Sequence, residues 1–146
     1  MLLPRRPLLR AFLVDHAYRV LLLHVTDGRT TWWEPPGDLP ASRSERAEET
    51  VLRVLRTDVA LSRGVRVGPC VWVARGRREE RTHVAWLDDP NAPGADAAPL
   101  TATTLGARWW TLDELAESRE AFRPERLPAL APGVVRGEYG PEPVSL

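Results

Sequence analysis

Arginine and tryptophan side chains are the first candidates for ligand binding in this sequence. Four arginines lie close together between two predicted strands: Arg75, Arg77, Arg78 and Arg81. A guanidinium fork matches the geometry of phosphate oxygens, so this segment could clamp a phosphate, although arginines in a turn are often only solvated. An indole ring could stack on a nucleobase or another flat ring, while core packing must account for most of the six tryptophans. Three indoles are candidates for that role: Trp33, Trp72 and Trp86.

His83 is the histidine best placed for acid–base chemistry. It follows Glu80 in a predicted strand whose alternation puts His83 and Ala85 on one face and Thr82, Val84 and Trp86 on the other. If the first face lines a cleft, His83 could act as acid or base; otherwise His83 is a core histidine with its hydrogen bonds satisfied. Cys70, which lies among apolar neighbours, is expected as a buried strand thiol rather than a nucleophile.

The first half of the chain predicts a hairpin followed by a long helix. Strand-forming residues fill 8–14 and 20–25, with a polar turn between them. Pro35 and Pro36 then interrupt regular structure. From Ser44, the expected N-cap, charged residues alternate with valine and leucine at helical spacing to about Thr57. Acidic residues near the start of this helix and arginines near its end suit the helix dipole.

The second half predicts strands joined by turns, and then two short helices. Strands are expected at 65–74, 82–87 and 107–110, and the long segment 88–104 is either a mobile loop or a lid. Thr111 and Glu114 form a capping box that opens one helix. Pro124 can start another, with Leu127 and Leu130 on its inner side. Residues 137–146 are expected to wrap the surface without adding to the core.

Composition excludes several classes of function. The chain has 146 residues, about the size of one domain, and its twenty acidic side chains balance twenty basic ones. Its net charge therefore produces no overall electrostatic attraction to nucleic acid or to an anionic membrane, and any anion site must be local. All the basic residues are arginine, which excludes mechanisms that need a lysine. Charges interrupt the apolar segment 8–25, so it predicts neither a membrane span nor a signal peptide, and the expected compartment is the cytoplasm.

The order of these elements, together with two motifs, resembles the Nudix superfamily. Residues 33–38, Trp-Glu-Pro-Pro-Gly-Asp, are similar to the family's Trp-x-x-Pro-Gly-Gly motif, and residues 108–115 are similar to its closing strand and helix. The likeness spans about 8–130 and leaves 131–146 as the C-terminal tail of a single domain. It implies an α/β (α+β) fold, a Nudix-type α/β/α sandwich with a mixed sheet between helices.

The sequence departs from the family in the Nudix box, the motif that carries its metal ligands. In the family, three glutamates on one helix face hold magnesium ions that bridge the substrate's diphosphate. The best alignment puts Glu45 on the first box glutamate and Arg53 on the box arginine. It places Val54, Thr57 and Asp58 where the three metal glutamates stand, so one carboxylate remains.

The resemblance nevertheless implies a reduced site for Mg²⁺ or Mn²⁺. Gly37 matches a glycine whose carbonyl contacts metal in the family, and Asp58 could hold one ion, with Glu80 or Glu49 completing the site. The alternative is a solvated helix face, because Glu45, Glu49 and Arg53 stand at i, i+4 spacing.

The resemblance implies a diverged enzyme that hydrolyses a nucleoside-diphosphate-linked or other diphosphate compound. Its catalytic candidates are Asp58, Glu80 and His83, and its expected partner is a small-molecule substrate, with no nucleic acid and no membrane. Two alternatives stay open: metal-independent chemistry such as isomerisation or cyclisation, and a binding or regulatory module without catalysis. A homodimer is also possible, because the family often dimerises.

Overall fold

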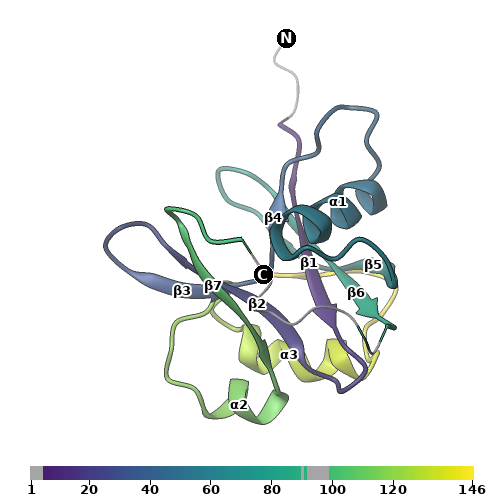
Figure 1. Ribbon diagram of the computed structural model, residues 1–146. Helices are drawn as coiled ribbons and strands as arrows, with labels where there is room; N and C mark the ends of the chain where they lie inside the picture. The colour runs from purple at the N-terminus through teal and green to yellow at the C-terminus, as the bar shows by residue number, and fades with distance from the viewer. Residues whose placement is uncertain (1–4, 90, 92–98) are drawn as a thin grey trace.

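A computed structural model describes residues 5–89, 91 and 99–146 of the chain. Its centre is a mixed sheet in which six strands follow the order β3-β2-β1-β6-β5-β8, while β4 pairs with β1 and β7 with β2 (Figure 1). The strands are β1 Leu8–Val14, β2 Val20–Thr26, β3 Thr31–Glu34, β4 Gly37–Asp38, β5 Val65–Ala74, β6 Glu80–Leu87, β7 Thr104–Trp110 and β8 Val144–Ser145. The helices are α1 Ala47–Val59, α2 Leu112–Glu117 and α3 Leu127–Val135. None of the described helices is long and apolar enough to cross a membrane.

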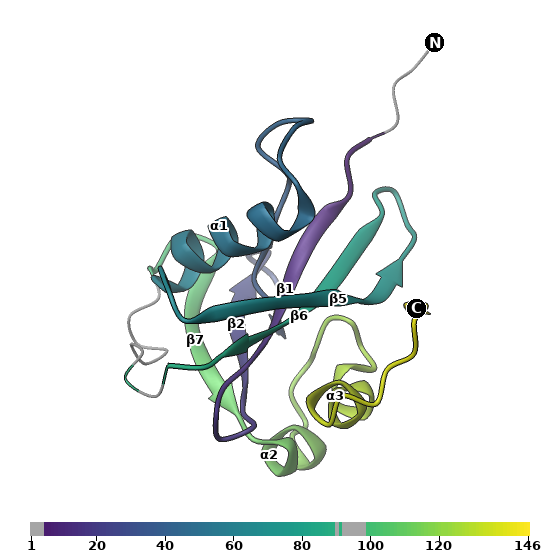
Figure 2. The same cartoon turned by 90° about the vertical axis from the view of Figure 1, so that its right-hand side faces the viewer.

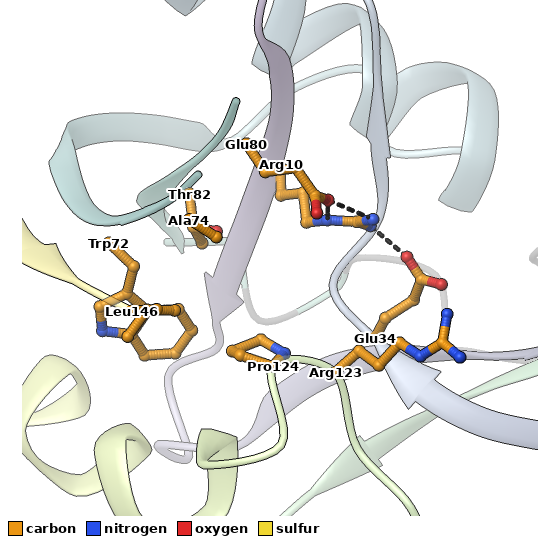
Figure 3. Close-up of a pocket in the computed structure, with 9 residues that line it drawn as sticks. All are labelled: Arg10, Glu34, Trp72, Ala74, Glu80, Thr82, Arg123, Pro124 and Leu146. Carbon is orange, nitrogen blue, oxygen red and sulfur yellow. Dashed lines mark hydrogen bonds and ion pairs between the residues drawn. The ribbon is translucent and has the colours of Figure 1, made fainter. Parts of the chain in front are cut away.

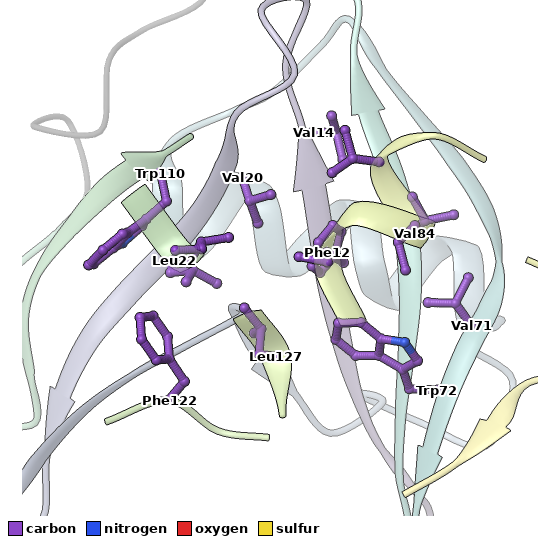
Figure 4. Close-up of a cluster of buried hydrophobic side chains, with 14 of the residues drawn as sticks. Phe12, Val14, Val20, Leu22, Val71, Trp72, Val84, Trp110, Phe122 and Leu127 are labelled. Carbon is purple, nitrogen blue, oxygen red and sulfur yellow. The ribbon is translucent and has the colours of Figure 1, made fainter. Parts of the chain in front are cut away.

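Helices cover both faces of the sheet, α1 on one side and α2 with α3 on the other (Figure 2). Alternate residues of β1 enter two separate cores, as the period of a strand requires. Phe12 and Val14 pack in the core under α3, whereas Ala11 and Leu13 pack in the core under α1. Figure 4 shows the first of these cores, with Trp72, Trp110 and Leu127 around Phe12. The predicted fold, a mixed sheet between helices, is confirmed.

The predicted hairpin is confirmed, and its first strand has a second partner. β1 pairs antiparallel with β2 through Leu13↔Leu21 and Val14↔Val20. Along its whole length β1 also pairs in parallel with β6, from Leu8↔Glu80 to Val14↔Trp86. β1 is therefore buried on both faces in its second half, which explains its nearly continuous apolar sequence.

The helix α1 begins two residues later than the sequence predicts. Its N-cap is Arg46, which has extended backbone and no side-chain cap, so the expected cap at Ser44 is wrong. The Ser44 hydroxyl instead contacts the Ser42 hydroxyl at 3.0 Å. The helix ends at Val59, where Ala60 takes the left-handed conformation with φ 58° and its N–H donates to Leu55. The cause of the shifted start is Glu45, whose side chain accepts from the Ala41 N–H and folds the preceding loop.

Other boundaries also differ from prediction. β6 begins at Glu80 and β7 at Thr104, both earlier than expected, and α3 begins at Leu127 rather than Pro124. Helix α3 continues to Val135, so residues 131–135 of the segment assigned to the C-terminal tail are helical. The tail also adds to the fold, because Tyr139 packs on the core and β8 pairs with β5. Within the predicted loop or lid 88–104, residue 90 and residues 92–98 lie outside the described residues.

Candidate functional site

Two cavities lie side by side, and the side chain of Arg10 borders both. Arg10 points to the α3 side of β1, and its guanidinium is held by two carboxylates (Figure 3). The Arg10 Nε donates to Glu80 Oε1 at 2.7 Å, and Nη1 donates to Glu34 and to the Pro35 carbonyl, the latter at 2.9 Å. Because both carboxylates and the guanidinium are partly buried, this charge is fixed in place between the cavities.

The first cavity, of about 260 Å³, is amphipathic. Trp72, Pro124 and Leu146 supply apolar wall, and Thr82 supplies a hydroxyl. Arg123 closes one side, its guanidinium 3.6 Å from the centre of the Trp32 ring. We refer to this hollow as the organic pocket because its walls can hold a flat or apolar group beside polar atoms.

The second cavity, of about 470 Å³, has both polar and apolar walls and lies between β4 and the end of α1. Gly37 and Asp38 of β4 face Thr57 and Asp58 of α1 across it. We call it the acidic pocket. Gly37 tolerates no side chain, since a Cβ there would lie 2.9 Å from the Leu9 carbonyl oxygen and 2.8 Å from the Arg10 Cγ. The close approach of β4 to β1 thus brings backbone atoms to the rim of the pocket.

Asp58 is the titratable group with the most perturbed environment in the acidic pocket. Burial, followed by repulsion from the Asp38 carboxylate, raises the pKa of Asp58 to about 6, and Arg53 offsets this only in part. A cation in this pocket would offset the repulsion that the Asp38 carboxylate exerts on ionised Asp58.

Glu45 and Arg53 brace the loop that leads to α1. Arg53 donates from Nε to Glu45 Oε2 at 3.0 Å and from Nη2 to the Leu39 carbonyl at 2.7 Å. Hydrogen bonds from Arg53, the Ala41 N–H and the Thr50 hydroxyl lower the pKa of Glu45 to about 2. Glu45 therefore has a structural role in these contacts, and Asp38 joins the same brace through a longer pair to Arg53 at 3.4 Å.

The structure gathers some of the predicted site residues and separates others. Glu80 and Trp72 line the organic pocket, and Gly37 and Asp58 line the acidic pocket. Arg75 and Arg78 lie at the β5–β6 turn, in a hollow that also reaches Glu80. Glu49, the other possible acid, is exposed and pairs with Arg46 at 2.6 Å.

Four other predicted residues lie away from both pockets. Trp33 is in the core, stacked on His24 with ring centroids 4.3 Å apart. Trp86 packs beside the same core, under the Arg66 guanidinium. Arg81 and His83 lie on the α1 side of the sheet, in a different hollow. The condition for acid–base chemistry at His83, that its face lines this cleft, is therefore not met.

Sequence reasoning missed the residues that connect the two pockets. Arg10 and Glu34 are 24 residues apart, and Arg10 and Glu80 are 70 apart, so no local spacing links them. One signal was present: Arg10 places a charge on the same strand face as Phe12 and Val14, which are both core residues. Arg123 carried no comparable signal.

Structural comparison identifies the fold. No family model matches the sequence, and no curated protein matches it. A hydrolase of the NUDIX family from Clostridium perfringens superposes with a TM-score of 0.69 at 15% identity, covering 92% of this chain and 98% of that one. This chain has the Nudix fold. A MutT protein from Methanosarcina mazei Go1 superposes with a TM-score of 0.66 at 14% identity, covering 94% of this chain and 98% of that one. An ADP-ribose pyrophosphatase from Streptococcus suis superposes with a TM-score of 0.64 at 12% identity, covering 96% of each chain.

The Nudix fold implies a divalent metal, and the residues present fit one hydrated ion rather than a cluster. Among the described residues no group of three or more His, Cys, Asp or Glu side chains could hold a metal. The acidic pocket does offer hard oxygen donors: the carboxylates of Asp38 and Asp58, the Thr57 hydroxyl and backbone at Gly37. Magnesium commonly binds through one or two carboxylates, retained waters and substrate phosphates. This donor set suits such an ion.

Proposed function

We propose that this protein hydrolyses a diphosphate compound, with a nucleoside-diphosphate-linked molecule as the preferred substrate class. The observation that carries the proposal is the acidic pocket, in which Asp38 and Asp58 face each other and the pKa of Asp58 is about 6. The Nudix fold adds support, because solved proteins of this fold include an ADP-ribose pyrophosphatase.

Asp58 and Asp38 would hold one Mg²⁺ or Mn²⁺ together with the Gly37 backbone. When bound, the ion would offset the charge of the diphosphate and lower the pKa of a coordinated water. The two carboxylates leave most of its coordination positions to water and phosphate. The protein's own contribution is to fix two oxygen donors from separate elements, β4 and α1, at one side of the substrate.

Arg10 would place the diphosphate between the pockets. Its guanidinium borders both cavities and is held by Glu34 and Glu80, so it offers N–H donors in a fixed position without the cost of ordering a mobile side chain. The organic group would then enter the organic pocket against Trp72 and Thr82. Arg75 and Arg78 lie near Glu80 and could meet the outer phosphate.

The direct test is hydrolysis of a substrate panel with Mg²⁺ or Mn²⁺. Nucleoside diphosphate sugars, dinucleotides and isoprenoid diphosphates are incubated with the protein, and release of phosphate or monophosphate is followed. We expect turnover that EDTA abolishes and that Asp58→Ala lowers at least about a hundredfold, since the variant removes one of two metal carboxylates. Glu48→Ala, an exposed acid on the same helix, is the matched control and should retain activity. Turnover that persists in EDTA or in Asp58→Ala would contradict the proposal.

A binding module without catalysis is the second candidate. It is favoured by Val54 and Thr57, which stand where the aligned box carries metal glutamates. Stabilisation of the protein by a diphosphate compound, without turnover of that compound, would support this candidate over hydrolysis. Metal-independent chemistry has less support, because His83 faces away from the pockets and Glu80 is engaged by Arg10.

A further inference from the structure

A third hollow, of about 580 Å³, lies on the α1 side of the sheet, across the sheet from the organic pocket. The alternation along β6 separates the sites, because Glu80 and Thr82 line the organic pocket whereas Arg81 and His83 line this hollow. In the same way, Arg10 of β1 faces the organic pocket and Leu9 faces the hollow. One pair of strands therefore forms a wall of both sites.

Four arginines from three parts of the chain surround this hollow. They are Arg5 and Arg6 before β1, Arg43 in the loop before α1, and Arg81 in β6. Together with His83, these arginines define what we call the basic groove.

The two acids of the groove already have basic partners. Glu45 is bound to Arg53 at 3.0 Å, and Glu79 lies 3.3 Å from Arg81 and 3.8 Å from Arg75. Within the described part of the chain, Arg5 and Arg43 form no ion pair. The groove thus carries excess positive charge in a chain whose net charge is zero.

Hydrogen bonds hold the walls of the basic groove in position. The Arg6 Nη1 donates to the Pro40 carbonyl at 3.1 Å, and the Arg78 Nη1 donates to the Arg6 carbonyl at 2.7 Å. His83 Nδ1 lies 3.1 Å from the Gly68 carbonyl oxygen. Because a carbonyl only accepts, Nδ1 carries the hydrogen and Nε2 is left for another partner. The groove is therefore largely formed before a ligand arrives.

We infer that the basic groove is a second ligand site, which binds a small phosphorylated anion on the face of the sheet opposite to the organic pocket. Each guanidinium has five N–H donors, so four of them offer more donors than one carboxylate can accept. A phosphate or diphosphate has more acceptor oxygens and matches the guanidinium fork. The hollow's volume of about 580 Å³ is in the range of small-molecule sites, which favours a small ligand. This inference does not rest on the proposed hydrolysis.

Binding of inorganic pyrophosphate, measured by calorimetry in EDTA, tests the groove apart from the metal-dependent cleft. We expect the double variant Arg43→Ser/Arg81→Ser to weaken binding at least tenfold. The matched control Arg56→Ser/Arg63→Ser removes two exposed arginines outside the groove and should change binding less than threefold. Asp58→Ala should bind pyrophosphate as the wild type does. No binding to the wild type below about 5 mM, or equal loss in both double variants, would overturn the inference.

Cys70 reports where the anion binds. It is the only cysteine of the chain, it lines the basic groove, and it is the strand partner of His83. Bound pyrophosphate should slow alkylation of Cys70 by iodoacetamide at least threefold in the wild type and in Asp58→Ala, but not in Arg43→Ser/Arg81→Ser. If calorimetry detects binding that the groove variant leaves intact, the anion lies elsewhere and the inference is wrong.

Discussion

The raised pKa of Asp58 is the clearest electrostatic consequence of the diverged sequence of α1. The Asp58 carboxylate is partly buried opposite Asp38, and the pKa rises from an ordinary value near 3.8 to about 6. Below the ordinary value the group is neutral in both the folded and the unfolded chain, so it has no effect on stability there. Between the two pKa values the unfolded chain loses its proton first, and the folded state becomes less stable as the pH rises.

Asp58→Asn should therefore stabilise the metal-free protein at high pH. Asparagine stays neutral, so the variant avoids the cost of ionising Asp58 in the folded state. In EDTA at pH 8 we expect its free energy of unfolding to exceed that of the wild type by about 2 kcal/mol, with no gain at pH 3.5. Urea unfolding at the two pH values measures the difference. Asp113→Asn, at an exposed aspartate of α2, is the control and should not gain stability at pH 8. A wild type as stable as Asp58→Asn at pH 8 would contradict this electrostatic assignment.

The predictable site residues are those whose role follows from local spacing. Gly37 and Asp58 became candidates because a motif aligns them, and both line the acidic pocket. Arg10 and Glu34 were missed because their pairing depends on which strands become neighbours. His83 was correctly placed on the face of Ala85, but sequence alone could not show which face of the sheet looks into the cleft.

At the scale of elements, α1 shows that a neighbouring side chain can prevent a suitable residue from capping a helix. Serine is a favoured N-cap residue, but Glu45 next to Ser44 accepts hydrogen bonds from the Ala41 N–H, the Thr50 hydroxyl and Arg53. These contacts bind the loop to the helix and leave Arg46 at the cap position. The α2 helix is the opposite case, because Thr111 and Glu114 form the complete capping box that the sequence predicts.

Removal of the Thr111 hydroxyl should lower the stability of the protein more than removal of the Ser44 hydroxyl. Thr111→Ala loses the bond from the Glu114 N–H and should lower the free energy of unfolding by about 1 kcal/mol. Ser44→Ala loses only an exposed contact to Ser42 and should cost less than about 0.5 kcal/mol. Chemical denaturation of both variants checks the difference. Equal losses would show that the hydroxyl of Ser44 caps α1 in solution.

The longer elements were predictable because each repeats its pattern several times. The valine-rich sequence of β5 and the apolar sequences of β1 and β2 predicted strands with nearly correct bounds. β4 and β8 each contain two residues, which is too few for any period. Their positions depend on tertiary pairing, with β4 against β1 and β8 against β5, so sequence patterns could not reveal them.

At the scale of the whole molecule, charged side chains are concentrated in two separate cavities. Asp38 and Asp58 line the acidic pocket, which Arg10 also borders, while Arg5, Arg43 and Arg81 surround the basic groove. The net charge of the chain reveals neither concentration of charge, because the acidic and basic residues balance over the whole chain. The neutral total correctly indicated that any anion site had to be local, but the fold was needed to place it.

The central claim is that protein and diphosphate hold one metal ion jointly, and Mn²⁺ binding tests it most directly. The relaxation rate of water protons is higher when Mn²⁺ is bound to a macromolecule than when it is bound in a small complex. Methylene diphosphate, which is not hydrolysed, should strengthen Mn²⁺ binding to the wild type and to Glu48→Ala at least about tenfold. Asp58→Ala should show no such increase. The claim would be contradicted if methylene diphosphate did not change the relaxation rate measured with the wild type. It would also be contradicted if methylene diphosphate raised that rate equally with Asp58→Ala.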